Sequence, residues 1–298
     1  MFFDKYKDKK DGVIRGYDIR SPKTKVIAVT ITLICTLMIC ICLFPAVWVF
    51  LASFKDIKEF MREVSILPNS FDWSRMAETW KAFKFVRYYK NSLIHVLGAT
   101  GCAVIFNGLL AYGLAVLKPK GHKIVVAFVM WTLLIPGVIS IVPLFRNINL
   151  LGMSKSFLPL WLAYGANAFY VMLFKQFFEE IPKELTEAAK LDGCGVWRMF
   201  LNVILPLSKP IIMVVAIFAV TAAWSDFLLP YLVLNGAKWA DGTTMETVMV
   251  KLFSFKDTPT DAVSVLRASF FAIIPPTIIF IIFQKQITDG AATGAVKG

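Results

Sequence analysis

The sequence predicts an all-α integral membrane protein with about six transmembrane helices, and three observations support this fold class. Hydrophobic residues make up 57% of the 298 positions and charged residues 17%, and the mean hydropathy is +0.66. This composition is more apolar than that of ordinary soluble domains. The apolar residues also gather into separate runs of about 20 residues, the length that a helix needs to cross the hydrocarbon core. Polar segments rich in lysine and arginine lie between these runs.

Six segments meet the length criterion and are taken here in chain order. They run over residues 26–52, 93–117, 124–145, 157–178, 211–234 and 266–283. The first run exceeds the 7–15 apolar residues of a cleaved signal peptide, so we expect an uncleaved helix. The last contains Pro275-Pro276, and we expect a kink there, with donors from neighbouring helices satisfying the carbonyls that the prolines free. The predicted division is a tail over 1–25, a transmembrane domain over 26–283 and a tail over 284–298.

Basic residues indicate how the chain is oriented in the membrane. The short loop over residues 118–123 holds three lysines, and the N-terminal tail holds eight basic residues. Because lysine and arginine collect in short cytoplasmic segments, the N-terminus is predicted inside. Six spans return the C-terminus to the same side. Segments 53–92 and 235–265 then lie outside, and segment 179–209 lies in the cytoplasm.

Several functional classes fit the sequence poorly. The net charge of +12 comes without an RNP or zinc-finger pattern, so an anionic membrane surface explains it better than nucleic acid does. Two histidines and no Cys-x-x-Cys pair argue against a zinc site. Few ionisable residues lie within the spans, and His95 and Asp226 are the two that stand out, whereas an ion-coupled transporter is expected to bury more charge. A membrane-embedded enzyme would need a paired-carboxylate, His/Asp or Ser/His arrangement that the spans lack.

Segment 179–209 has the pattern of a helix-turn-helix elbow. Pro182 suits a first helical turn because its missing N–H would be unpaired there, and Glu184 and Glu187 follow near the positive end of the helix. Gly193 permits the left-handed conformation that ends a helix. A second helix is predicted over 196–204, stopping before Pro206. Four residues fall along one side of the first helix at helical spacing: Leu185, Ala188, Ala189 and Asp192.

This elbow resembles the cytoplasmic coupling motif of the binding-protein-dependent ABC importer permeases. The matching residues are Glu187-Ala188-Ala189, Gly193 and Ile204-Leu205-Pro206, and Asp192 before the glycine is typical of the carbohydrate branch. The order of further short landmarks is similar to that of the maltose-permease G-subunit family. They are Ser53-Phe54-Lys55, Asn91-Ser92, Ala111-Tyr112-Gly113-Leu114-Ala115, Ile135-Pro136, Pro143-Leu144, Trp224-Ser225-Asp226-Phe227, Pro230 and the tail Gly294-Ala295-Val296-Lys297-Gly298. Ser225 stands where the family usually has Asn, and residues 243–251 match poorly, which leaves the substrate open.

The resemblance implies a permease subunit in a bacterial cell membrane that binds no cofactor itself. Its partners would be a second permease chain, two copies of a cytoplasmic ATPase that uses ATP and Mg²⁺, and an extracellular binding protein that delivers a sugar or oligosaccharide. The chain has no Gly-x-x-x-x-Gly-Lys-Ser/Thr phosphate loop, so it is not expected to hydrolyse ATP. The resemblance places ATPase coupling at Glu184, Glu187, Ala188, Ala189, Asp192, Gly193, Leu205 and Pro206. It also implies a contact between the ATPase and the tail residues Val296, Lys297 and Gly298.

Candidates for the sugar path are aromatic residues, whose faces stack on pyranose rings, and one carboxylate. They are Tyr164, Tyr170, Trp224, Asp226, Phe227 and Tyr231. Aromatic residues in spans also serve as packing or interface anchors, and the sister permease can hold much of the sugar contact. The outer segment 235–265, with Trp239, either contacts the binding protein or is a solvated loop. The sequence does not identify the sugar.

Overall fold

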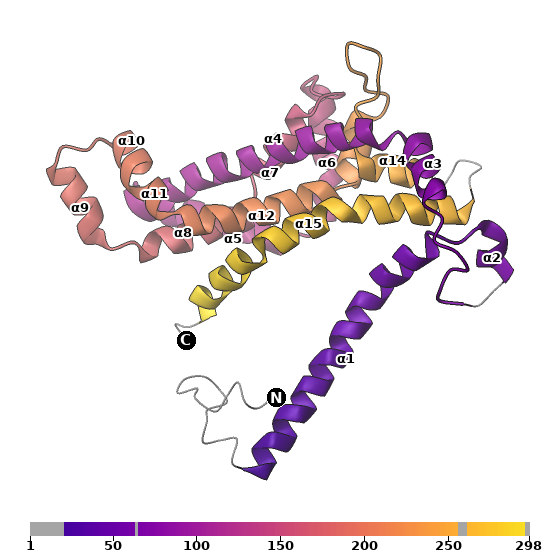
Figure 1. Ribbon diagram of the computed structural model, residues 1–298. Coiled ribbons are helices and arrows are strands. Elements are labelled where there is room, and N and C mark those ends of the chain that lie inside the picture. Colours follow the sequence, from indigo (N-terminus) through magenta and orange to yellow (C-terminus); the bar gives the residue numbers. More distant parts are fainter. Residues whose placement is uncertain (1–20, 63–64, 256–260, 296–298) are drawn as a thin grey trace. The chain divides into compact units, whose positions relative to one another are not determined.

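A computed structural model describes residues 21–62, 65–255 and 261–295, and these parts are helical apart from loops and an isolated antiparallel bridge between Lys238 and Thr244 (Figure 1). The chain forms two compact units, Met1–Met76 and Ala77–Gly298. The predicted all-α membrane architecture is confirmed. Three of the described helices are long and apolar enough to cross a membrane, or up to five if each bent pair counts as one span.

The first unit holds α1 (Pro22–Ala52) and α2 (Ile57–Arg62). Helix α1 corresponds to the first predicted span and begins four residues earlier, at Pro22, which suits the first turn of a helix. Its apolar side chains are exposed along most of its length, as expected where lipid rather than protein surrounds a helix.

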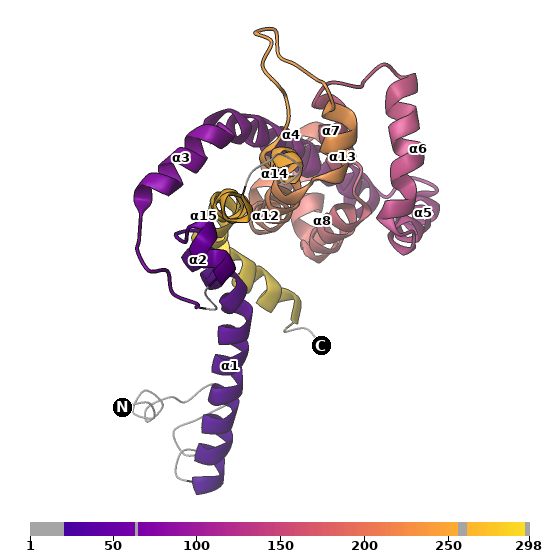
Figure 2. The same ribbon diagram turned by 90° about the vertical axis from the view of Figure 1, so that its right-hand side faces the viewer.

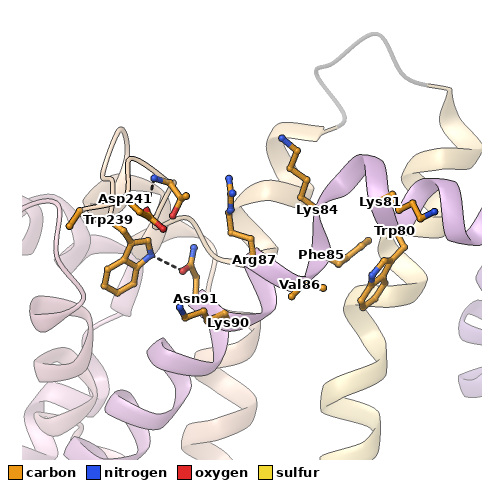
Figure 3. Close-up of a pocket in the computed structure, with 12 residues that line it drawn as sticks. Trp80, Lys81, Lys84, Phe85, Val86, Arg87, Lys90, Asn91, Trp239 and Asp241 are labelled. Carbon is orange, nitrogen blue, oxygen red and sulfur yellow. Dashed lines mark hydrogen bonds between the residues drawn. The ribbon is translucent and has the colours of Figure 1, made fainter.

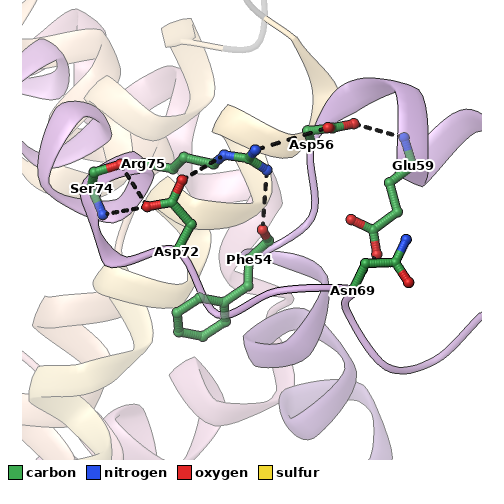
Figure 4. A network of polar contacts seen from close by, with 7 residues as sticks. All are labelled: Phe54, Asp56, Glu59, Asn69, Asp72, Ser74 and Arg75. Carbon is green, nitrogen blue, oxygen red and sulfur yellow. Dashed lines mark hydrogen bonds and ion pairs between the residues drawn. The ribbon is translucent and has the colours of Figure 1, made fainter.

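The segment after α1 is held by the residues around Ser53-Phe54-Lys55. The Phe54 ring is fully buried and meets Phe71 and Trp73 edge-on, with centroids 5.1 and 4.9 Å apart. Figure 4 shows the polar network beside it, in which the Arg75 guanidinium lies 3.2 Å from the Asp72 carboxylate and 3.9 Å from that of Asp56. This family landmark therefore has a structural role at the end of α1.

The second unit is built around α4 (Phe85–Tyr112), which continues as the π-helix η3 (Gly113–Leu117). Helix α4 packs against α7, α8 and α12, and α12 packs against α15 (Figure 2). The remaining helices follow in chain order. They are α5 (His122–Leu134), α6 (Gly137–Leu150), α7 (Leu158–Gly165), α8 (Ala168–Glu180), α9 (Lys183–Leu191), α10 (Val196–Met199), η4 (Phe200–Ile204), α11 (Leu205–Leu207), α12 (Lys209–Ser225), α13 (Leu228–Leu234), α14 (Val248–Phe255) and α15 (Ala262–Ala295). Helix α3 (Trp73–Phe83) carries the boundary between the units.

Three of the predicted spans are broken. The third becomes α5 and α6, bent by 107°, and Figure 2 shows α6 along its length and α5 nearly end-on. The cause is Pro136, which forces Ile135 into an extended conformation (φ −86°, ψ 119°). The fifth becomes α12 and α13, separated by Asp226 in an extended conformation.

The fourth predicted span is also wrong as a single helix, because α7 and α8 are separated at Ala166-Asn167. Asn107 on α4 bridges this break. Its Nδ2 donates to the Tyr164 carbonyl at 2.9 Å, and its Oδ1 accepts from the Asn167 N–H at 2.9 Å. Asn167 in turn caps α8 by accepting from two backbone N–H groups. One buried amide therefore satisfies backbone groups that an unbroken helix would have paired internally.

The prolines of the sixth span do not break α15, which is assigned as one helix. Pro275 and Pro276 free the carbonyls four residues earlier, those of Phe271 and Ala272. Tyr89 Oη donates to the first at 2.6 Å, and Trp224 Nε1 donates to the second at 3.0 Å. The expectation that neighbouring helices satisfy these carbonyls is confirmed. The helix is longer than predicted and runs into the segment assigned to the C-terminal tail.

Candidate coupling site

The elbow begins with α9, which ends in a glycine-dependent turn. Gly193 adopts φ +74°, as predicted. Its N–H donates to the Lys190 carbonyl at 3.0 Å, and the Cys194 N–H donates to the Ala189 carbonyl at 2.9 Å. These two bonds form a Schellman motif, which satisfies carbonyls that the end of a helix leaves unpaired. The turn sends the chain directly into α10.

The second helix of the elbow is longer than predicted. It runs through α10, the π-turn η4 and α11 to Leu207, so it does not stop before Pro206. Pro206 stands in the first turn of α11, immediately after the π-turn, where a missing N–H costs least. The chain then bends by 79° between Leu207 and Lys209 into α12. Ser208 at this bend is buried, and its Oγ donates to the Ile204 carbonyl at 2.6 Å.

The inner side of the elbow is anchored to the end of α4. Ala189 is 8% exposed and packs in one cluster with Met199, Phe200, Ile204 and Tyr112. The Tyr112 ring lies 5.0 Å from that of Phe200, and its hydroxyl donates to the Val196 carbonyl at 3.0 Å. The elbow is therefore joined to a long transmembrane helix by packing and by a directional bond.

The outer side of the elbow combines acidic and apolar side chains. Glu184, Glu187, Ala188 and Asp192 are exposed, as are Leu205 and Pro206 at its far end. Leu191 is 90% exposed and Trp197 is 66% exposed. Of the four residues predicted to share one side of α9, Ala189 faces inward, whereas Leu185, Ala188 and Asp192 are exposed. The tail residues Val296, Lys297 and Gly298 lie outside the described residues.

The structure divides the six candidates for the sugar path. Tyr170 and Trp224 are buried, and Trp224 satisfies a carbonyl of α15. The rings of Phe227 and Tyr231 are tilted relative to each other with centroids 5.4 Å apart, and the centroid of the Phe253 ring lies 4.3 Å from that of Phe227.

The two remaining candidates lie at helix breaks. Tyr164 is half-buried beside the α7–α8 break, with its ring 6.0 Å from that of His95. Asp226 lies between α12 and α13.

Three residues that position these elements were not singled out as site residues. Asn107 fixes the α7–α8 break, Tyr112 holds the elbow and Tyr89 satisfies α15. Asn107 is the one of the three that leaves a signal in the sequence, because a buried amide in an apolar span needs partners. Its partners lie 57 and 60 residues away, which local periodicity does not reveal.

The described helices make up a polytopic membrane protein, in which one side of the elbow is exposed and the other is joined to a long apolar helix. The chain belongs to the family described as "Binding-protein-dependent transport system inner membrane component", whose model matches residues 102–290.

Several characterised permeases are similar to this chain along most of their length. The arabinooligosaccharides transport system permease protein AraQ of Bacillus subtilis is 28% identical over 283 residues, which cover 93% of this chain and 99% of AraQ. The trehalose/maltose transport system permease protein MalG of Thermococcus litoralis is 29% identical over 268 residues, 88% of this chain and 94% of MalG. The diacetylchitobiose uptake system permease protein NgcG of Streptomyces coelicolor is 28% identical over 256 residues, 85% of this chain and 83% of NgcG.

The fold is also found in a solved structure. It is similar to that of a chain of a bacterial ABC transporter involved in the import of the acidic polysaccharide alginate, with a TM-score of 0.75 and 18% identity over 89% of this chain and 98% of that one. Together, the family and the relatives show that the chain is a permease component of an ABC importer of the carbohydrate class.

Proposed function

We propose that this chain forms half of the translocation path for a sugar or oligosaccharide and receives the work of ATP hydrolysis through the elbow. The outer side of the elbow carries this proposal. Leu191 and Trp197 expose large apolar side chains on the same elbow that exposes Glu184 and Glu187. Exposed apolar groups rimmed by charge mark protein contacts. A cytoplasmic ATPase with an apolar cleft and a basic partner for Glu187 suits this surface.

The remaining partners follow from the same proposal. A second, related permease completes the path, and two copies of the ATPase bind ATP and Mg²⁺. An extracellular binding protein delivers the sugar. The names of the relatives, which specify arabinooligosaccharides, trehalose or maltose, and diacetylchitobiose, support carbohydrate as the substrate class. The tail residues Val296, Lys297 and Gly298 are proposed to contact the ATPase as well.

The proposed orientation places both termini and the elbow in the cytoplasm, and Cys194 tests it. This thiol is half-buried within the elbow, whereas Cys35, Cys40 and Cys42 lie on α1 and Cys102 on α4. We expect a charged, membrane-impermeant maleimide to label Cys194 in inside-out vesicles and not in intact cells. A Cys194→Ser variant identifies the labelled site. Labelling of Cys194 in intact cells would place the elbow outside and refute the coupling role.

The contact with the ATPase is tested by a polar substitution on the outer side of the elbow. We expect Leu191→Ser to reduce the amount of ATPase that co-purifies with the permease. Leu67→Ser is the matched control, because Leu67 is also largely exposed and lies in the segment after α1. Undiminished ATPase recovery with Leu191→Ser and Glu187→Gln combined would contradict the proposal.

For the sugar path we propose Phe227 and Tyr231, with Asp226 and Tyr164 beside them. Phe227, Tyr231 and Phe253 form an aromatic cluster in which Tyr231 and Phe253 are exposed. The break at Asp226 supports a path here, because irregular backbone at membrane depth is tolerated where it lines a cavity or is buried in protein. We expect Phe227→Ala to raise the half-saturating sugar concentration for uptake without changing the amount of complex recovered. Unchanged uptake would remove Phe227 from the path.

A further inference from the structure

A cleft of about 720 Å³ opens where α3 meets α4, facing the hairpin over residues 237–245 (Figure 3). Its lining includes four basic side chains, Lys81, Lys84, Arg87 and Lys90, spaced three residues apart in the sequence. All four are exposed. None of them forms an ion pair with a carboxylate among the residues that the structure describes. The cleft thus carries a concentrated excess of positive charge.

Among the described residues, Asp241 is the one carboxylate that lines this cleft. Hydrogen bonds from Thr243 hold the pKa of Asp241 below its usual range, and the charges of Arg87 and Lys90 lower it further. Asp241 therefore stays ionised at neutral pH and cancels one of the four positive charges.

The hairpin side of the cleft is held in place by Asn91. The Asn91 side chain is buried. Its Nδ2 donates to the carbonyls of Thr244 and Glu246 at 2.9 and 2.8 Å, and its Oδ1 accepts from Trp239 Nε1 at 2.9 Å. This network joins the start of α4 to the hairpin and fixes Trp239 at the edge of the cleft. A preformed surface of this kind loses less entropy when a partner binds.

The cleft lies at the opposite end of α4 from the elbow. The cleft includes Phe85 and Asn91, whereas Tyr112 at the other end holds Val196. The continuous helix Phe85–Leu117 has 33 residues, which corresponds to about 50 Å at 1.5 Å per residue. If the elbow lies in the cytoplasm, as the proposed function requires, the cleft faces the extracellular side.

We propose that this cleft receives an acidic patch on the extracellular binding protein, an inference that rests on the proposed function. The charge favours an anionic occupant, since a neutral sugar gains nothing from an excess of three positive charges. The exposure of all four cations favours a protein surface, because rim charges steer association and set its rate. Trp239 supplies the large aromatic contact typical of protein interfaces.

The experiment measures association of the binding protein encoded with this permease. The assembled permease–ATPase complex is placed in nanodiscs of zwitterionic phosphatidylcholine. We expect Arg87→Glu with Lys90→Glu to slow association by about tenfold at low salt, because steering by charge is lost. In the wild type, association should slow as salt rises from about 0.1 M to about 1 M, where the screening length falls from about 10 Å to about 3 Å. In the double variant this salt dependence should largely disappear.

Lys120→Glu with Lys123→Glu is the matched control. It makes the same change in charge in the loop at the far end of α4, and association of the binding protein should be unchanged. If the double reversal prevents assembly, the neutral pair Arg87→Gln with Lys90→Gln replaces it, with a smaller expected effect in the same direction. Restoration of fast association by replacing an acidic residue of the binding protein with lysine would identify the partner patch.

Other outcomes overturn the proposal. Association rates and salt dependence equal to those of the wild type would show that the cleft does not receive the binding protein. A defect seen only in nanodiscs with anionic lipid would assign the cleft to lipid headgroups. A defect confined to uptake of carboxylated sugars would assign it to substrate. A failure of the proposed function can be distinguished from a failure of the cleft proposal. If the proposed function is wrong, the binding protein will not stimulate ATPase activity even in the wild-type complex.

Discussion

Replacing Gly193 should uncouple ATP hydrolysis from transport, and the structure sets the size of the effect. Gly193 has φ +74°, a conformation that costs an L-residue about 1–2 kcal/mol. A Cβ atom placed there meets no atom within 4 Å, so the cost is conformational and not a clash within this chain. A change of 1–2 kcal/mol alters an equilibrium by a factor of about 5–30. The elbow would therefore occupy its docking conformation correspondingly less often.

The variants should rank by how well each side chain tolerates left-handed backbone. We expect Gly193→Asn to retain most function, Gly193→Ser to lose more, and Gly193→Val to lose most, because a β-branched residue is a rare outlier at positive φ. Gly195→Ser is the matched control. Gly195 lies two residues away, has φ −69° and is equally open, and serine suits the N-cap position that it occupies.

The assay reconstitutes the importer in liposomes and measures sugar uptake and ATP hydrolysis in the same sample. The expected result is fewer sugar molecules per ATP, or less ATPase recovered with the permease, in the order given above. Gly195→Ser should match the wild type. Wild-type uptake together with wild-type stimulated ATPase activity in Gly193→Val would refute the role of this turn.

Three further perturbations test other contacts. Tyr89→Phe should lower the stability of the complex in a detergent melting assay by about 1 kcal/mol. In a Pro275→Ala background this loss should disappear, because the alanine supplies a backbone N–H to the Phe271 carbonyl; an equal loss with and without the Pro275→Ala substitution would contradict the assignment. Tyr112→Phe should cost about 1 kcal/mol and reduce sugar transported per ATP, and unchanged coupling would disprove its anchoring role. Asp241→Asn should speed association of the binding protein. Hydrogen bonds from Thr243 lower the pKa of Asp241 below its usual range, so its charge is lost only under strongly acidic conditions, and the gain should be constant from about pH 5 to pH 8. A gain that varies within this interval would contradict this prediction.

The elbow could be predicted well because its determinants are local. Pro182 and Gly193 each act through their own backbone, and a reader of the sequence needs no distant partner to interpret them. The error at Pro206 has a local cause as well. The rule that proline stops a helix assumes regular α-helical bonding, whereas here a π-turn precedes Pro206 and places it in a new first turn.

The breaks within the predicted spans show where local reasoning fails. Pro136 marks the bend between α5 and α6. A hydropathy average counts the apolar residues on both sides of Pro136 as one run, because it does not register a change in the direction of the chain. The α7–α8 break depends on Asn107, whose partners lie on another helix. Trp224 was a sugar-stacking candidate because it is an aromatic residue in a span. Its Nε1 donates to the Ala272 carbonyl, 48 residues away, and the sequence does not reveal this bond. Its position on a sugar path stays a prediction.

Helix α4 connects the cleft with the elbow, and the two proposals depend on these two features. Asn91 ties its outer end to the hairpin, and Tyr112 ties its inner end to the elbow. Between them, Tyr89 donates to the part-buried Phe271 carbonyl that Pro275 frees. Sliding α4 along α15 would break this hydrogen bond, at a cost of about 1 kcal/mol. A docking partner that displaced the hairpin would therefore act first on the Asn91 contacts at the start of α4. Coupling through α4 requires that the helix has two discrete arrangements, and that the binding partner and the ATPase each favour one of them. The hydrogen bonds of Asn91, Tyr89 and Tyr112 are the contacts that would differ between the two arrangements.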